Sequence, residues 1–458
     1  MRPRWPAILA AATAAALLPL TGAAATPHTP TQPHSLAGAA RSVSGSAPAA
    51  RTVNFRVVGH SDQGGDGFNA DVWGHKGYAY VGVWSGPTCP ATGVKVTDIR
   101  TPSRPTVVSV LHNPKGTSAE DVVVRSVRTK SFHGDLAVTG IQACDDKSPV
   151  FRGLQFFDVT NPRHPRELSR WRAPGPVGGC HEVDLIARTD GRVLAACAVP
   201  FAEQTNRTDE VNVIDVTDPA APRKTDGWAI KRNLGINPAT TAQNVGCFPA
   251  SFAHSVRFTD GGYTLYASYW DVGTIRLAVN GRARIGYVAR TDIAPPDEDG
   301  DNHSMTLAKG GRVLLINPED FSPIECKPAS KFGGWGEVHI YDNTRRAGTR
   351  PLGTFSTADS RSSRTDGFYA VHNTEVVQGD QAFSSWYSDG IVWWELSDPR
   401  HPTQRGQFVP PAAADPQGVF PKIPIVWGVY PDPGSGLILA SDINSGLWIL
   451  KPVGLGKF

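Results

Sequence analysis

A short apolar stretch followed by an acidic residue and two prolines recurs along the chain. The clearest copies occupy residues 154–165, 211–222 and 391–402, and a weaker copy occupies residues 93–105. Each copy is a short apolar run that ends in residues that favour turns, which predicts β-strands rather than helices. A repeat of this kind indicates an architecture built from repeated units.

Each copy belongs to a larger unit of four predicted strands. In the third unit, residues 181–187 and 193–199 form a hairpin around Gly191, residues 211–216 form the third strand, and a fourth strand leads into Trp228. The seven units begin near residues 69, 120, 181, 254, 303, 372 and 427. We therefore predict an all-β fold, a seven-bladed β-propeller of four-stranded blades, rather than a solenoid, whose repeats are shorter.

The last unit has only three strands of its own, because its third strand, residues 446–450, lies close to residue 458. Residues 53–59 form an additional strand before the first unit. We predict that this N-terminal strand pairs with the last blade and closes the ring, since closure removes exposed strand edges.

The N-terminal residues differ in composition from the repeats. Residues 1–25 contain Arg2 and Arg4, an apolar stretch at 7–20 and a small-residue site at 23–25, the pattern of a signal peptide. The apolar stretch is too short for a membrane anchor, and no later segment reaches the roughly 20 apolar residues of a membrane span. Residues 26–50, rich in Pro, Ser, Thr and Ala, are predicted to be a disordered linker, which leaves residues 51–458 for the propeller. We expect a secreted, soluble, monomeric protein.

The net charge indicates which kinds of partner the protein can bind, and the cysteine content bears on the redox state of its compartment. The formal net charge is only +3, and the basic residues are scattered, which argues against nucleic acid as a partner. The six cysteines of an exported chain are expected to form disulfides, although a thiolate metal site or a catalytic thiol is an alternative. The preferred pairs are Cys89–Cys144, Cys180–Cys197 and Cys247–Cys326.

Four consecutive units carry a histidine at the same register, at the start of the predicted first strand. In a propeller this strand lines the central channel, so its first residues face the channel mouth. Counting back from each hairpin glycine predicts a ring of Asn69, Glu120, His181, His254, His303, His372 and Trp427. Neutral imidazole is a common ligand of copper and zinc. The sequence therefore predicts a transition-metal site at His181, His254, His303 and His372, suited to oxidation or hydrolysis of a small extracellular substrate.

Carboxylates near this register are the candidate catalytic groups. Glu120 and Glu182 can act as a general base or orient an imidazole, and Asp71, Asp121 and Glu375 lie close to the same register. Alternatively, the histidines bind no metal and only connect neighbouring blades through hydrogen bonds. A carboxylate glycoside hydrolase, with Glu120 opposite Asp71 or Glu375, is a further alternative.

The loops between second and third strands are rich in aromatic residues. They contain Trp84, Phe201, Trp270, Phe321, Trp335, Trp386 and Tyr387. These side chains either form a platform for a carbohydrate or aromatic ligand or pack inside the loops. A platform would favour a non-enzymatic module that binds cell-wall glycan or a protein partner. The acidic residues 297–301 before His303 are a weaker candidate for calcium binding.

The strand that ends in Asp-Val-Thr/Ser-Asp/Asn-Pro-x-x-Pro resembles the LVIVD repeat of secreted and surface bacterial β-propellers. The resemblance extends over residues 53–452 and is degenerate in the fourth and fifth units. It implies a propeller fold and no particular activity. The histidine-bearing units are also similar, more distantly, to the selenium-binding-protein and methanethiol-oxidase propellers, in which channel histidines hold copper.

Overall fold

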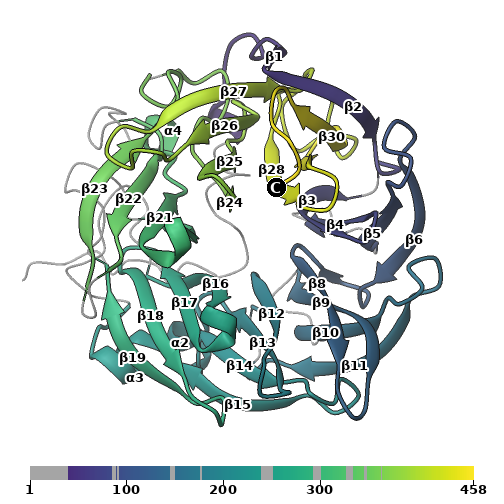
Figure 1. The fold of residues 1–458 in the computed structure, drawn as a ribbon, viewed down its shortest axis with the longest axis vertical. Helices are drawn as coiled ribbons and strands as arrows, with labels where there is room; N and C mark the ends of the chain where they lie inside the picture. Colours follow the sequence, from purple (N-terminus) through teal and green to yellow (C-terminus); the bar gives the residue numbers. More distant parts are fainter. Residues whose placement is uncertain are drawn as a thin grey trace, which may run out of the picture.

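Seven antiparallel sheets are arranged in a ring around a central channel in the computed structural model (Figure 1). The structure describes residues 40–458 except 66, 85–88, 90–91, 145–149, 176–177, 239–250, 292–300, 326–333, 345–347 and 363. Five of the sheets contain four strands and two contain five, and each includes the four strands of one blade in the expected order, with the first strand facing the channel. The predicted seven-bladed β-propeller is therefore confirmed.

The blades follow the predicted repeat units. Blade 1 contains β3 (Phe68–His75), β4 (Tyr78–Trp84), β5 (Gly93–Asp98) and β6 (Thr106–His112). Blade 2 contains β8 (Val122–Arg128), β9 (His133–Ala143), β10 (Gly153–Asp158) and β11 (Arg166–Arg172), with the short β7 (Thr117–Ser118) also paired with β9. Blade 3 contains β12 (Val183–Ala187), β13 (Val193–Ala198), β14 (Val211–Asp215) and β15 (Arg223–Trp228).

The next three blades repeat this arrangement. Blade 4 contains β16 (Ala253–Thr259), β17 (Thr264–Tyr269), β18 (Gly273–Val279) and β19 (Ile285–Arg290). Blade 5 contains β20 (Asn302–Ala308), β21 (Val313–Pro318), β22 (Val338–Asp342) and β23 (Arg350–Phe355). Blade 6 contains β24 (Thr374–Val377), β25 (Gln381–Ser385), β26 (Ile391–Glu395) and β27 (Thr403–Val409).

Blade 7 combines strands from both ends of the chain. It contains β28 (Val426–Asp432), β29 (Leu437–Asp442), β30 (Gly446–Pro452) and β2 (Phe55–Ser61). The pairing of β2 with β30 runs from Phe55 opposite Pro452 to Ser61 opposite Leu447. The preceding strand β1 (Arg51–Val53) pairs instead with β27 of blade 6. The segment predicted as one closing strand is thus divided at Asn54, and its two parts pair with two adjacent blades.

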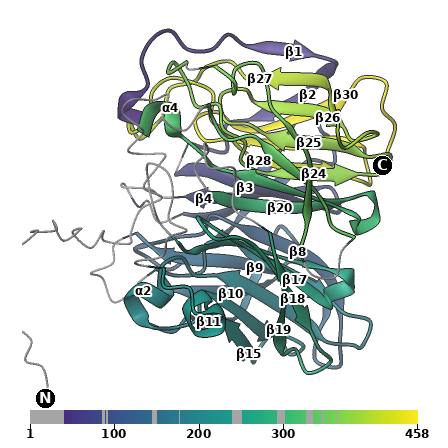
Figure 2. The same cartoon turned by 90° about the vertical axis from the view of Figure 1, so that its left-hand side faces the viewer.

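Short helices occupy connections between strands and, in one case, the segment before β1. They are η1 (Ala40–Ser42), α2 (Ala202–Asn206), α3 (Ile230–Leu234), η2 (Asp260–Gly262), η3 (Lys309–Gly311) and α4 (Ser322–Glu325). Helices α2 and α4 lie in loops between second and third strands, on the same face of the ring (Figure 2). Residues 40–50, assigned by sequence to the linker, include the buried Ala40, and Ser44 donates a backbone hydrogen bond of 2.8 Å to Thr365. Every helix in the described ranges is too short or too polar to cross a bilayer.

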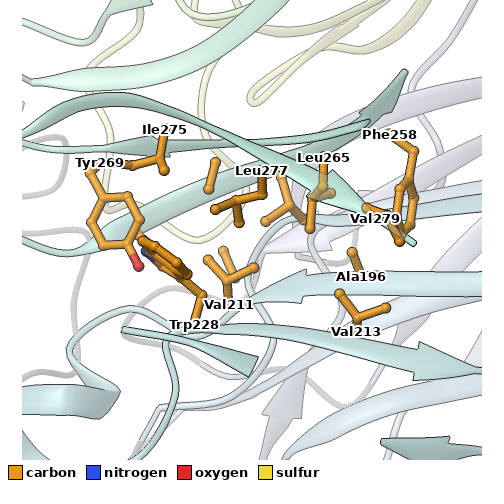
Figure 3. Close-up of a cluster of buried hydrophobic side chains, with 14 of the residues drawn as sticks. Ala196, Val211, Val213, Trp228, Phe258, Leu265, Tyr269, Ile275, Leu277 and Val279 are labelled. Atoms are coloured by element: carbon orange, nitrogen blue, oxygen red, sulfur yellow. The ribbon is translucent and has the colours of Figure 1, made fainter. Parts of the chain in front are cut away.

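The hydrophobic core lies between the facing surfaces of neighbouring blades. Figure 3 shows part of the cluster between blades 3 and 4. Its members include Ala196, Val211, Val213 and Trp228 of blade 3, and Phe258, Leu265, Tyr269, Ile275, Leu277 and Val279 of blade 4. Each fully buried Val, Leu or Ile contributes roughly 1.5–3 kcal/mol, so contacts between blades stabilise the ring.

The Asp-Pro segments form turns at the ends of the third strands. Asp158 and Asp215 accept backbone hydrogen bonds from Thr160 (3.0 Å) and Thr217 (2.9 Å), respectively. At Asp98, hydrogen bonds from Arg100 hold the pKa of the carboxyl at about 2. The repeated Asp-Pro segments therefore serve to form turns, as expected for Asp and Pro at these positions.

Two of the three predicted disulfides are present. Cys89–Cys144 connects the loops that follow the second strands of blades 1 and 2, and Cys180–Cys197 lies within blade 3. Cys247 and Cys326, the third predicted pair, lie outside the described residues. The four bonded cysteines are not available as thiolate ligands or nucleophiles.

Deletion of residues 51–60 tests how the ring closes. The deletion removes β1 and most of β2, which exposes the edges of β27 and β30 and removes the pairing between the two ends of the chain. We expect cooperative thermal unfolding to be lost in circular dichroism or calorimetry, whereas deletion of residues 26–39 should leave it intact. Unchanged melting of the 51–60 deletion would contradict closure by β2.

Candidate functional site

One extra residue interrupts the pairing near the start of the inner strands. In blade 4, Ala253 pairs with Tyr269 and Ser255 with Ser268, so that His254 between them has no partner position. In blade 5, His303 is the extra residue between Asn302 and Ser304. Such a β-bulge changes the direction of the side chains in the bulged strand. The bulge explains why these histidines leave the regular alternation between the two faces of the blade.

Backbone hydrogen bonds show the same bulge in blades 3 and 6. Ala198 accepts from the N–H of His181 (2.9 Å) and donates to the carbonyl of Glu182 (3.0 Å). Ser385 makes the corresponding bonds with His372 and Asn373, at 3.0 and 2.9 Å. All four predicted histidines are therefore bulge residues.

The bulge positions in blades 1, 2 and 7 show whether the other predicted ring residues occupy the same place as the histidines. Trp427 is the extra residue of blade 7, between Val426 and Gly428. In blade 2, Asp121 accepts a hydrogen bond from the N–H of Gly140 (3.2 Å), which leaves Glu120 at the bulge position. In blade 1 the interruption follows Asn69, which still pairs with Val83. The position predicted for Asn69 thus belongs to Ala70, because the extra residue enters one position later.

The four imidazoles form a continuous row at the channel. Nε2 of His181 lies 2.9 Å from Nε2 of His254. Ring centroids are 4.0 Å apart for His254 and His303, and 4.1 Å apart for His303 and His372. The row ends against Trp427, whose ring centroid is 4.6 Å from that of His372. All four side chains are buried.

Burial makes neutral imidazole the stable form for three members of this row. It lowers the pKa of His254 and of His303 well below the usual range, and it lowers the pKa of His372 to about 3. Nδ1 of His254 has no hydrogen-bond partner among the described residues. An uncharged imidazole with an available lone pair is the form that binds a metal ion.

Two polar side chains of blade 2 contact the first histidine. Nδ1 of His181 lies 3.0 Å from Oε1 of Gln142 and 2.8 Å from Oε2 of Glu120. When Nδ1 donates its hydrogen to these oxygens, Nε2 is left as the acceptor or ligand atom. Gln142 was not identified from the sequence, because it lies on the second strand of blade 2 outside the repeated register.

The row contains two compact groups of metal-ligand atoms. His181, Glu182 and His254 each offer an atom within 4.8 Å of the others, and so do His254, His303 and Glu319. His254 belongs to both groups. Glu319 follows β21 and accepts a hydrogen bond from the hydroxyl of Tyr387, so it is held beside the row. Glu319 could not be identified from the sequence, because it lies in a loop outside the repeated pattern.

The residues that directly follow the bulge residues form a second ring of side chains. Asp71, Asp121 and Glu182 occupy this position in blades 1–3, opposite polar residues of blades 4–6. They line a cavity of about 120 Å³, enough for a few water molecules. Burial, followed by repulsion from neighbouring carboxylates, raises the pKa of Asp71 and Glu182 well above the usual range. Burial also raises the pKa of Asp121 to about 7, against hydrogen bonds from the backbone N–H groups of Val183 and Val122.

The remaining predicted site residues, Glu375 and the loop aromatics, do not belong to the histidine row. Glu375 forms an ion pair with Arg257. Trp84, Phe321, Trp335 and Tyr387 belong to one hydrophobic cluster on the loop face of the channel, and Trp270 and Trp386 are also buried. Of the two predictions for these aromatics, packing inside the loops is therefore correct for these six side chains. Only Asp301 and Asn302 of the acidic segment before His303 are described.

Comparison with known proteins adds support for the fold alone. No protein-family profile matches the chain, and a search of curated proteins finds no relative. The β-propeller domain of Myceliophteria thermophila Cps50 (Swd1) is structurally similar, with a TM-score of 0.51 and 12% sequence identity over 86% of this chain and 98% of that chain. At this identity the likeness defines the class of protein, a β-propeller, and nothing about its activity.

Close contact between blades holds the bulges in place. A Cβ added to Gly82 would lie 1.6 Å from the carbonyl oxygen of Glu120, and one added to Gly140 would lie 2.7 Å from that of His181. Hydroxyl groups make similar contacts elsewhere, since Ser304 donates to the carbonyl of His372 at 2.8 Å. The backbone of each of these bulges thus packs against a small side chain of the preceding blade.

Substitution of Gly140 tests this packing. Gly140→Ala should displace the backbone at His181 and lower the free energy of unfolding by about 1–3 kcal/mol, the usual cost of overpacking. Denaturant unfolding measures the effect. The matched control is Gly286→Ala in β19, where no atom lies within 4 Å of the added Cβ. Equal stability of the two variants would contradict the argument.

Proposed function

We propose that this protein is a secreted β-propeller that binds a transition metal ion, copper or zinc, in the histidine row. The observation that carries the proposal is the buried row of His181, His254, His303 and His372, in which His254 shares a compact donor group with each neighbour. Nitrogens bound to adjacent positions of one ion at about 2.0 Å lie roughly 2.8–3.3 Å apart. The 2.9 Å between Nε2 of His181 and Nε2 of His254 fits this spacing.

Carboxylates supply the remaining protein ligands in each group. Glu182 completes the set with His181 and His254, and Glu319 completes the set with His254 and His303. A bound ion with an open coordination position would acidify water or support oxidation of a small substrate. Glu120, beside Nδ1 of His181, is placed to accept a proton from that imidazole. When the ion occupies the group of His254, His303 and Glu319, Glu182 is not a ligand and borders the water-sized cavity as a general base.

Export and family membership are part of the same proposal. The signal-like residues 1–25 and the linker-like residues 26–50 support secretion, and the two disulfides are compatible with an oxidising compartment. The repeat ending in Asp-Val-Thr/Ser-Asp/Asn-Pro-x-x-Pro supports kinship with the LVIVD-repeat propellers.

Metal analysis tests the histidine site directly. Metal-free protein incubated with Cu²⁺ or Zn²⁺ and then desalted should retain stoichiometric metal by mass spectrometry. His254→Gln should lower the affinity at least about 100-fold, because it removes the ligand shared by both donor groups. His401→Gln, at an exposed turn, is the matched control and should bind as the wild type does. Absence of stoichiometric copper, zinc or iron after reconstitution would exclude the proposal.

Gln142 provides a subtler test through the orientation of His181. Gln142→Ala removes the acceptor 3.0 Å from Nδ1 of His181 without removing a ligand. Loss of such a partner typically lowers metal affinity about 10–100-fold. Competition with a chromophoric chelator measures the change, and Gln381→Ala in blade 6 serves as the control. Wild-type affinity in Gln142→Ala would contradict an orienting role of Gln142 and leave Glu120 as the partner of Nδ1.

The alternative function is that of a non-enzymatic module that binds cell-wall glycan or a protein partner. It predicts a different experimental result. Such binding should survive replacement of all four histidines by Gln. The described loop aromatics offer little exposed surface for it, since Trp335, Trp386 and Trp270 are buried.

A further inference from the structure

A second group of ligand atoms lies next to the histidine row and consists only of carboxylates. Asp71, Glu120 and Glu182 come from three successive blades, and each offers an oxygen within 4.8 Å of the others. The bulges produce this arrangement: Glu120 is the bulge residue of blade 2, and the other two residues follow the bulges of blades 1 and 3. Glu120 is 1% exposed and Asp71 is 8% exposed.

The hydrogen bonds around this group leave oxygens without donors. Asp71 accepts a bond of 2.9 Å from the side-chain amide of Asn373, and its carboxyl lies within hydrogen-bonding reach of the carboxyl of Glu182. Oε1 of Glu120 and Oε1 of Glu182 accept none from the described residues. Within the described ranges no lysine or arginine forms an ion pair with any of the three. The nearby basic groups are His181 beside Glu120, His254, and Arg257, which is ion-paired with Glu375 and also attracts the carboxylate of Glu182. Buried carboxylates in this situation either remain protonated or bind a cation.

Asp121 lies in the same ring of carboxylates but differs from the three residues in its hydrogen bonding. Its Oδ2 accepts a hydrogen bond of 2.6 Å from the backbone N–H of Val183, and it belongs to none of the compact donor groups. Burial and acidity alone therefore do not define the group. The unpaired oxygens of Glu120 and Glu182, together with the convergence on one point, set the three residues apart.

We propose that Asp71, Glu120 and Glu182 form a second cation site, which binds a hard divalent ion such as Ca²⁺ or Mn²⁺. Three carboxylates are the ligands that such ions prefer, whereas copper and zinc favour the adjacent imidazoles. Water in the channel cavity lined by Asp71 and Glu182 would complete the coordination. The site goes beyond the histidine site and stands without it, although Glu182 belongs to donor groups of both.

The shared residue predicts how variants separate the two sites. Asp71→Asn should abolish only the oxygen site, His254→Gln should abolish only the nitrogen site, and Glu182→Gln should weaken both. Asp121→Asn, which keeps an acceptor for Val183, is the matched control within the same ring.

The experiment is calorimetric titration of the metal-free full chain with CaCl₂ and, separately, MnCl₂. We expect one ion per chain, a loss of affinity of at least tenfold in Asp71→Asn, and wild-type binding in Asp121→Asn and His254→Gln. Absence of binding by both ions up to millimolar concentration, or unchanged binding in Asp71→Asn, would overturn the oxygen site. Neither result would affect copper or zinc binding by the histidines, so the two proposals fail separately.

Folding of the variants is checked by thermal melting in EDTA. If Asp71→Asn does not fold, Glu120→Gln decides the question, because it removes charge from the same group and keeps the size of the side chain. In folded variants, added Ca²⁺ or Mn²⁺ should no longer raise the melting temperature, as it should in the wild type. An equal rise in wild type and Glu120→Gln would contradict the site.

Discussion

The contact between the bulge of one inner strand and the small residue of the preceding blade is the constraint on which the channel depends. At Gly82 and Gly140 the neighbouring backbone comes so close that even a methyl group does not fit. Because that backbone belongs to Glu120 and His181, the contact fixes both side chains relative to the channel. The close packing of each bulge against a small residue, repeated between blades, thus determines where the side chains of the site lie.

Two chemically different environments arise from adjacent positions in the same strands. The bulge position supplies four buried imidazoles, and burial lowers the pKa of His254, His303 and His372 so that these three are neutral. The following position supplies Asp71, Asp121 and Glu182, whose raised pKa values reflect burial beside like charges. Protons or cations must therefore balance the acidic ring, while the imidazoles keep lone pairs free for a metal. Glu182 contacts both environments, and any ions bound there would influence each other through it.

The loops between second and third strands shield the histidine row from solvent. Phe321, Trp335, Tyr387 and their neighbours form a hydrophobic cluster over the face where the histidines lie, and Tyr387 also holds Glu319 beside His303. The aromatic residues in these loops thus contribute to the site by excluding water and orienting a carboxylate. This role differs from that of a stacking platform, which needs exposed rings.

The sequence by itself determined the seven repeats, the order of strands and the histidine register, because each is a local pattern that recurs along the chain. It suggested the two disulfide pairs that are present, but only the structure decided them, since a pairing depends on which cysteines the fold brings together. The sequence could not determine that the bulge of blade 1 falls on Ala70 rather than Asn69, since bulges depend on pairing between strands. Nor could it reveal Gln142 and Glu319, which reach the histidines from other parts of the fold. Only the closed ring decides which carboxylates of separate blades meet, because convergence on one point is a property of tertiary packing.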